Sequence, residues 1–154
     1  MVKTAIQQIV DRLGSLDCVR SIGLSSNPLP AHKDEGDIDL FIYCDPIPDS
    51  VTRGRLYPED LTDAAYFKSR VFDSAIWGDA DYTEIKGIET WLMYFTTDAV
   101  TADFDEIITG ARIKRINGYY PVGRLAMFRN MTVLLDKSGF LAGLQGLSLI
   151  HISQ

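Results

Sequence analysis

The sequence has few of the residues that build disulfide frameworks or zinc sites. Its two cysteines, Cys18 and Cys44, cannot form a disulfide framework, so a reduced, cytoplasmic protein is expected. Only two histidines occur, His32 and His151, and neither belongs to a His/Cys cluster. No run of 18 apolar residues exists, which excludes an ordinary transmembrane helix. The first fourteen residues are charged and amphipathic without an apolar core, so a secretory signal is not expected.

Positive charge is also scarce. Fifteen Lys and Arg residues stand against 21 Asp and Glu residues, which gives a net charge of −6. General nucleic-acid binders normally carry a basic face, so this class is disfavoured. Residues 34–63 and 73–106 each hold nine acids, whereas residues 112–129 hold five bases and no acid. Most of these charges are expected on solvated faces. The alternative interpretation is that an acidic centre holds metal while a basic segment meets phosphate.

The remaining composition is that of one globular domain, with 46% apolar and 23% charged residues over 154 positions. Apolar periodicity and turn residues predict the elements along the chain. Helices are expected at 3–13, 59–70, from Thr97 or Asp98 to Gly110, and at 123–131; strands are expected at 19–24, 38–44, 81–85, 88–95 and 132–136. Residues 50–57 are expected to be irregular. This order predicts an α/β (α+β) fold in which helices flank a mixed β-sheet.

The end of the chain has an unusual sequence. Residues 147–153, LSLIHIS, resemble the translation of a transposon-end sequencing adapter. We therefore expect the domain to span residues 1–146 and to be truncated, with residues 147–154 as a non-native tail. The alternative is a C-terminal β-strand, to which the same residues are suited.

The strongest local motif is an Asp-x-Asp pair, Asp37 and Asp39, at the start of the apolar run IDLFIYC. Residues two apart on a strand project from the same face, with Cα atoms roughly 6–7 Å apart. Their carboxylates can therefore converge on one or two cations. Oxygen ligands without His or Cys favour Mg²⁺ or Mn²⁺ over Zn²⁺. A divalent cation would also relieve the repulsion between two carboxylates.

Two other acidic motifs fit the sequence less well. Phosphatases of the haloacid-dehalogenase type also use Asp-x-Asp, but there the apolar strand precedes the acids, and here it follows them. An EF-hand loop requires further ligands that residues 34–39 do not supply.

The helix at 3–13, the run Val19-Arg-Ser-Ile-Gly-Leu-Ser-Ser-Asn, the loop and the run Gly-Asp-Ile-Asp-Leu-Phe-Ile-Tyr-Cys together resemble nucleotidyltransferases of the DNA polymerase beta superfamily. The resemblance is greatest to the small bacterial nucleotidyltransferase-domain proteins. The later runs Ile88-Glu-Thr-Trp-Leu-Met-Tyr-Phe, Gly118-Tyr-Tyr-Pro and Leu134-Leu-Asp-Lys-Ser-Gly resemble that group as well. The similarity thus covers about residues 3–145.

The resemblance implies the roles of particular residues. Asp37 and Asp39 would bind Mg²⁺, and Glu89 on a neighbouring strand would be the third carboxylate. Trp91 shares the face of Glu89, and some members of the family carry an acid nearer that point. The nucleotide phosphates would lie at the loop after the first strand, for which the candidates are Gly23, Ser25, Ser26, Asn27 and, from the basic segment, Arg124. The family has Gly-Ser in this loop, whereas this chain has Ser-Ser-Asn.

The function expected from this resemblance is Mg²⁺-dependent transfer of a nucleoside monophosphate from a nucleoside triphosphate to an acceptor hydroxyl, with release of pyrophosphate. The acceptor, a small molecule or a protein, is not identified by the sequence. Two alternatives remain open. One is a degenerate, non-catalytic module that binds a nucleotide or a protein, suggested by Ser-Ser-Asn. The other is an unrelated Mg²⁺ hydrolase that uses the same acids.

Overall fold

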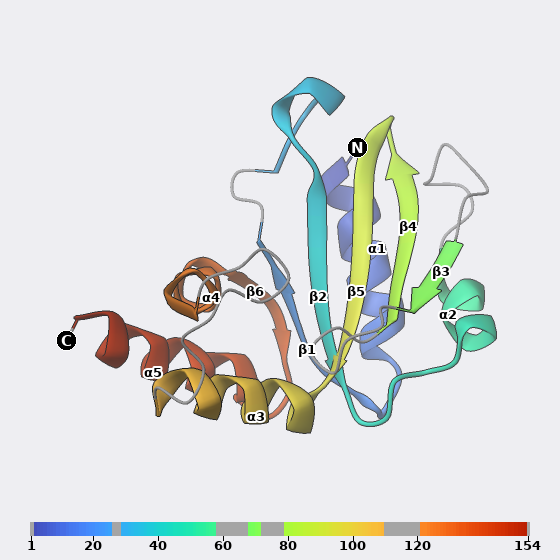
Figure 1. The fold of residues 1–154 in the computed structure, drawn as a ribbon. Helices are drawn as coiled ribbons and strands as arrows, with labels where there is room; N and C mark the ends of the chain where they lie inside the picture. The colour runs from blue at the N-terminus through green and yellow to red at the C-terminus, as the bar shows by residue number, and fades with distance from the viewer. Residues whose placement is uncertain (1, 26–28, 58–67, 72–78, 110–120, 154) are drawn as a thin grey trace.

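A computed structural model describes residues 2–25, 29–57, 68–71, 79–109 and 121–153, with the backbone alone for 68–71, 121–125 and 148–153. The described chain forms one mixed sheet with helices on both faces (Figure 1). The helices are α1 (Val2–Gly14), α2 (Ser50–Leu56), α3 (Thr97–Ile108), α4 (Pro121–Asn130) and α5 (Phe140–Ser153), with a short 3₁₀ turn at Lys33–Glu35. The strands are β1 (Val19–Leu24), β2 (Ile38–Cys44), β3 (Lys68–Val71), β4 (Asp79–Ile85), β5 (Ile88–Thr96) and β6 (Thr132–Asp136).

The sheet has the strand order β3-β4-β5-β2-β1-β6. Its two central strands, β2 and β5, run parallel and pair over the whole length of β2. The other described neighbours pair antiparallel. The mixed sheet expected from the sequence is therefore confirmed, and β2 lies at its centre because its apolar residues are buried on both faces.

Alternating side chains of the strands divide the core into two clusters. On one face α1 packs against Ile38, Leu40 and Ile42 of β2, in a cluster that Leu56 of α2 joins. On the other face α3, α4 and α5 cover Phe41 and Tyr43. Helix α1 buries the stripe Ala5, Ile6, Ile9, Val10 and Leu13, which is the helical spacing seen in the sequence.

Most expected elements are confirmed within one or two residues. The strands at 19–24, 38–44 and 132–136 have the bounds expected. The hairpin is confirmed too, and its turn residues Lys86 and Gly87 both have positive φ angles, 53° and 77°, as a two-residue turn between twisted strands requires. The cap of α3 is Thr96, one residue before the expected position, and its hydroxyl accepts the Ala99 N–H.

Two expectations about elements are wrong, and one alternative is excluded. Residues 50–56 form helix α2, because Asp49 caps it by accepting the Thr52 N–H. Residues 68–71 form strand β3 beside β4 instead of the end of a helix, and residues 58–67 lie outside the described part. The final residues extend α5, so the alternative of a C-terminal strand is excluded. Among the described residues, none of the helices has both the length and the apolar character needed to cross a membrane.

Candidate functional site

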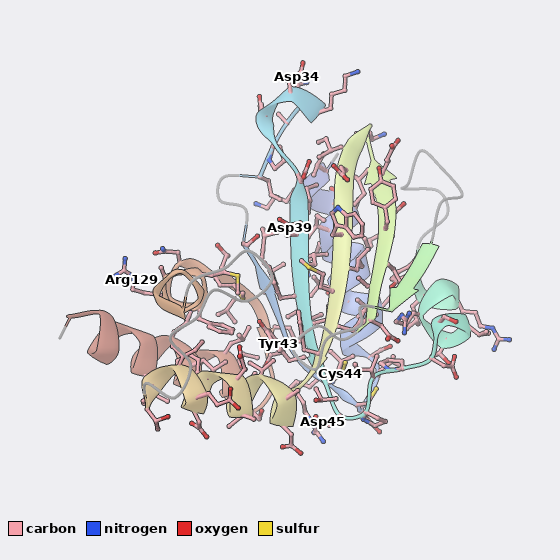
Figure 2. The ribbon with its side chains drawn as sticks, viewed as in Figure 1. Asp34, Asp39, Tyr43, Cys44, Asp45 and Arg129 are labelled. Carbon is pink, nitrogen blue, oxygen red and sulfur yellow. The ribbon has the colours of Figure 1, made fainter. Side chains whose placement is uncertain are left out.

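The Asp-x-Asp pair lies where the chain enters β2. Gly36, with a φ of 134°, leads into Asp37, which is exposed. Ile38 then points into the core against α1 and is 0% exposed, so that Asp39 emerges on the opposite face and is half-buried. Phe41 and Tyr43, further along this face, are covered by the helices, whereas Asp39 lies beyond their apolar cluster (Figure 2). The alternation of β2 thus places Asp39 on the part of the sheet next to the helical layer.

Strand β5 brings its own polar residues to the same face. Asp39 is directly paired with Trp91, and Ile38 with Thr90. Glu89 therefore lies one residue before the first pair of the two strands, on the same side of the sheet as Asp37, and its charge acts on Asp39 together with that of Asp37. The Trp91 indole N–H donates to Glu89 Oε1 at 3.2 Å. The structure thus brings Asp37, Asp39 and Glu89 together at one corner of the sheet, the acidic corner. Trp91 is the residue of β5 that lies directly opposite Asp39.

The electrostatics of this corner show an excess of negative charge. The pKa of Asp39 is raised above its ordinary value by burial, and further by the neighbouring carboxylates of Asp37 and Glu89. A hydrogen bond from the Ser25 hydroxyl acts in the opposite direction. Burial and like charge both disfavour the ionised carboxylate of Asp39. A cation bound here would be attracted by the same carboxylates that repel one another without it.

The three carboxylates do not form a closed cage. Within the described parts of the chain, no group of three or more His, Cys, Asp or Glu residues is placed to hold a metal ion. Mg²⁺ seldom needs such a cage, because it commonly binds through one or two carboxylates together with waters and substrate phosphates. The donors present, Asp37 and Asp39, fit that two-carboxylate arrangement.

The expected phosphate loop is described only in part. The Ser25 N–H donates to the Asp39 carbonyl oxygen at 3.2 Å, which places Ser25 beside the acidic corner. Ser26 and Asn27 lie outside the described residues. Gly23 is buried in β1, and a Cβ there would lie 2.0 Å from the Met131 sulfur. Its missing side chain therefore serves close packing against Met131.

The remaining expected contact comes from α4. The backbone of Arg124 lies in that helix, but its side chain is outside the described part of the chain. The two cysteines fit their expected role as small core residues. Cys44 is buried, and burial raises the pKa of its thiol to about 12, which leaves no reactive thiolate at neutral pH.

Sequence reasoning missed a second cluster of charge on the opposite face. Arg53 of α2 is 0% exposed, and its Nε and Nη2 donate to the two carboxylate oxygens of Asp81 at 2.8 and 3.0 Å. Its Nη1 donates to Asp79 and to the Pro48 carbonyl oxygen. The Tyr57 hydroxyl donates to Asp81 as well. The available signal was the strand phase, because Asp81 shares the period-2 face of the buried Ile85.

No protein-family model matches this sequence, and no curated protein matches it either. Among solved structures, the fold is similar to the crystal structure of a nucleotidyltransferase-like protein from Exiguobacterium sibiricum 255-15, with a TM-score of 0.52. The fold is nucleotidyltransferase-like. The two chains share 9% sequence identity, so the likeness concerns the fold alone. It covers 97% of this chain and 39% of the other, so this chain spans well under half of that nucleotidyltransferase-like protein.

Proposed function

We propose that this chain is a Mg²⁺-dependent nucleotidyltransferase domain that transfers a nucleoside monophosphate from a nucleoside triphosphate to an acceptor hydroxyl. The observation that carries the proposal is the acidic corner at the start of β2, where burial and two neighbouring carboxylates raise the pKa of Asp39. The nucleotidyltransferase-like fold supports the same function.

In this proposal each residue has a definite task. Asp37 and Asp39 would hold Mg²⁺, and Glu89 is the third carboxylate of the corner. Ser25, with Ser26 and Asn27 beyond it, and Arg124 from α4 would contact the triphosphate. Bound Mg²⁺ supplies charge neutralisation on the phosphates and lowers the pKa of a coordinated hydroxyl.

The reaction balances without a further reactant. The acceptor oxygen bonds to the α-phosphorus, and the bond from that phosphorus to the bridging oxygen breaks. Pyrophosphate leaves with that oxygen, and the hydroxyl proton passes to a nearby base. A net charge of −6 agrees with a small-molecule or protein acceptor rather than with general nucleic-acid binding. We further propose a cytoplasmic location, where nucleoside triphosphates and reduced cysteines coexist.

The decisive experiment measures pyrophosphate release from each of ATP, GTP, CTP and UTP with Mg²⁺ and a panel of hydroxyl acceptors. We expect Asp39→Asn to abolish release while the protein remains folded, because it removes one of two cation ligands. Asp34→Asn is the matched control, since it removes the same charge from an exposed turn of the adjoining loop (Figure 2). Equal transfer by wild type and Asp39→Asn would refute the assignment.

A second candidate is a non-catalytic nucleotide-binding module. It is suggested by Ser25-Ser26-Asn27, which stand where the family resemblance implies Gly-Ser. Thermal unfolding with and without nucleotide separates the candidates. A melting shift with Mg²⁺ and nucleotide, but no pyrophosphate with any acceptor, favours the binding module.

A further inference from the structure

Strands β4 and β5 hold two neighbouring cross-strand pairs beside the acidic corner, one of aromatic residues and one of acidic residues. Tyr82 is directly opposite Trp91, and Glu84 is directly opposite Glu89. The rings of Tyr82 and Trp91 meet edge to face with their centroids 5.1 Å apart. Two like charges directly opposite on neighbouring strands destabilise a sheet, so this arrangement needs a compensating contact.

Each aromatic residue supplies that contact to the acid on its own strand. The Tyr82 hydroxyl donates to Glu84 Oε1 at 3.1 Å, and the Trp91 indole N–H donates to Glu89 Oε1 at 3.2 Å. Tyr82 lies on β4, the strand on the side of β5 away from β2. Trp91 is therefore packed toward β4 while it holds one oxygen of Glu89. Asp39 lies on the other side, on β2 (Figure 2).

Glu89 differs from Asp37 and Asp39 in its strand and in its hydrogen bond. Asp37 and Asp39 are two residues apart on one face, whereas Glu89 lies on the next strand and has an oxygen bound by the indole. Among the described residues the three do not form a metal-holding group. Nonetheless Glu89 is near enough to act on the charge of Asp39.

We propose that Trp91 is a positioning residue that keeps Glu89 outside the coordination sphere of the cation, so that Asp37 and Asp39 are the carboxylate ligands among the described residues. This inference rests on the proposed function. It departs from the direct metal ligand that the family resemblance implies for Glu89. The second oxygen of Glu89 would then accept a hydrogen bond from a water or from the acceptor hydroxyl beside the bound cation. Partners of this outer kind orient the ligands of a metal and tune its chemistry.

The test titrates the full chain with Mn²⁺ alone, with electron paramagnetic resonance reporting unbound Mn²⁺. Asp39→Asn should weaken binding by more than about 100-fold, because it removes a direct ligand, whereas Glu89→Gln should weaken it only about 10-fold, as the loss of an outer partner does. Glu84→Gln is the matched control, because it removes the same charge from the position opposite and should have a similarly small effect. Glu89→Gln as damaging as Asp39→Asn would show direct coordination and overturn the inference.

The role of Trp91 is tested by Trp91→Phe, which removes the N–H but keeps an aromatic ring against Tyr82. Glu89 is then released to join the cation, so Mn²⁺ affinity should rise about fivefold. In a Glu89→Gln background the same substitution should change affinity less than about twofold, since the two residues act as one unit. An equal effect in both backgrounds overturns the inference, and thermal unfolding checks that each variant is folded.

Failure of the proposed function has a different signature. If Asp39→Asn binds Mn²⁺ as well as the wild type does, the cation site itself is absent and both proposals fall. If Asp39→Asn loses binding but Glu89→Gln loses it equally, the cation site stands and only the outer position of Glu89 is wrong.

Discussion

Two strands of the sheet carry the same short pattern, an aspartate on either side of one apolar residue. Asp79 and Asp81 flank Ala80 in β4, and Asp37 and Asp39 flank Ile38 at the start of β2. The first pair points to the face covered by α1 and α2, where the Arg53 guanidinium binds both carboxylates. The second points to the opposite face, where the charges that act on Asp39 are carboxylates.

The difference teaches how one motif can serve structure or chemistry. In β4 the cation belongs to the protein, it is fully buried, and it is further held by the Tyr94 ring 4.9 Å from its central carbon. In β2 the raised pKa of Asp39 shows a charge that burial and its neighbours oppose. We interpret the first pair as an internal ion pair that fastens α2 to the sheet, and the second as a place for an external cation.

The largest expected effect comes from removing the internal cation. Arg53→Met should lower the free energy of unfolding by about 3–5 kcal/mol, because it leaves the buried Asp81 carboxylate without its cation, with the Tyr57 hydroxyl still bonded to it. Chemical denaturation measures this loss. Arg55→Met, an exposed position of the same helix, is the control and should change stability by less than about 0.5 kcal/mol. A small loss for Arg53→Met would mean that Asp81 gains another partner, and the contrast between the two pairs would disappear.

An intermediate loss of stability is expected on substitution of Asp136, a carboxylate that accepts hydrogen bonds from N–H and O–H donors. Asp136 accepts from the Ser21 hydroxyl and from the Leu141 and Ala142 N–H groups at the start of α5. Burial opposes its ionisation, but these donors outweigh burial and lower its pKa. Asp136→Asn should lower the free energy of unfolding by about 1 kcal/mol at neutral pH.

The sign of its pH dependence follows from that lowered pKa. The stabilisation is fully present above the ordinary carboxyl pKa of 3.8 and is lost as pH falls through the lower folded value. The difference between wild type and Asp136→Asn in urea midpoints should therefore shrink in acid. The same difference at neutral pH and at about pH 2 would contradict the donor explanation.

The smallest change in the free energy of unfolding is expected for a substitution at the candidate site, and there the change is an increase. The folded pKa of Asp39 lies above 3.8, so the ionised carboxylate opposes folding at neutral pH. Without added metal, Asp39→Asn should raise the free energy of unfolding by up to about 1 kcal/mol, the scale of a like-charge contact. The gain should vanish below pH 3.8, where both folded and unfolded wild type are protonated. A loss of stability at neutral pH would make Asp39 a structural residue like Asp81.

The central part of the fold could be predicted because its local signals agree. The apolar spacing of α1, the all-apolar β2 and the Lys86-Gly87 turn each indicate one structure, and the structure has it. Helix α2 was missed because only seven residues form it, so that its Asp49 cap and the buried Arg53 decide its existence more than apolar spacing does. Strand β3 was missed because pairing with β4, a distant segment, determines it.

The candidate site was predictable in its residues but not in its arrangement. Period-2 alternation placed Asp37 and Asp39 on one face, and the turn placed Glu89 on a strand of the same sheet. The register of β5 against β2 depends on tertiary packing, and it decides that Trp91, not Glu89, lies level with Asp39. The indole bond to Glu89, by contrast, joins two residues on the same face of one strand. The match between Arg53 and Asp81 is a contact between distant segments that no local pattern contains.

The parallel pairing of β2 with β5 also has a consequence for how the chain folds. Ser25 and Asp39 belong to the β1–β2 pair, whereas Glu89 and Trp91 belong to the β4–β5 hairpin. Each pair is local in sequence, but docking one pair on the other closes the long segment between residues 44 and 88. The acidic corner therefore exists only once this non-local pairing of β2 with β5 has formed. Amide protons of β2 that face β5 should report that pairing, and a cation that binds the finished corner acts on the docked state rather than on either hairpin.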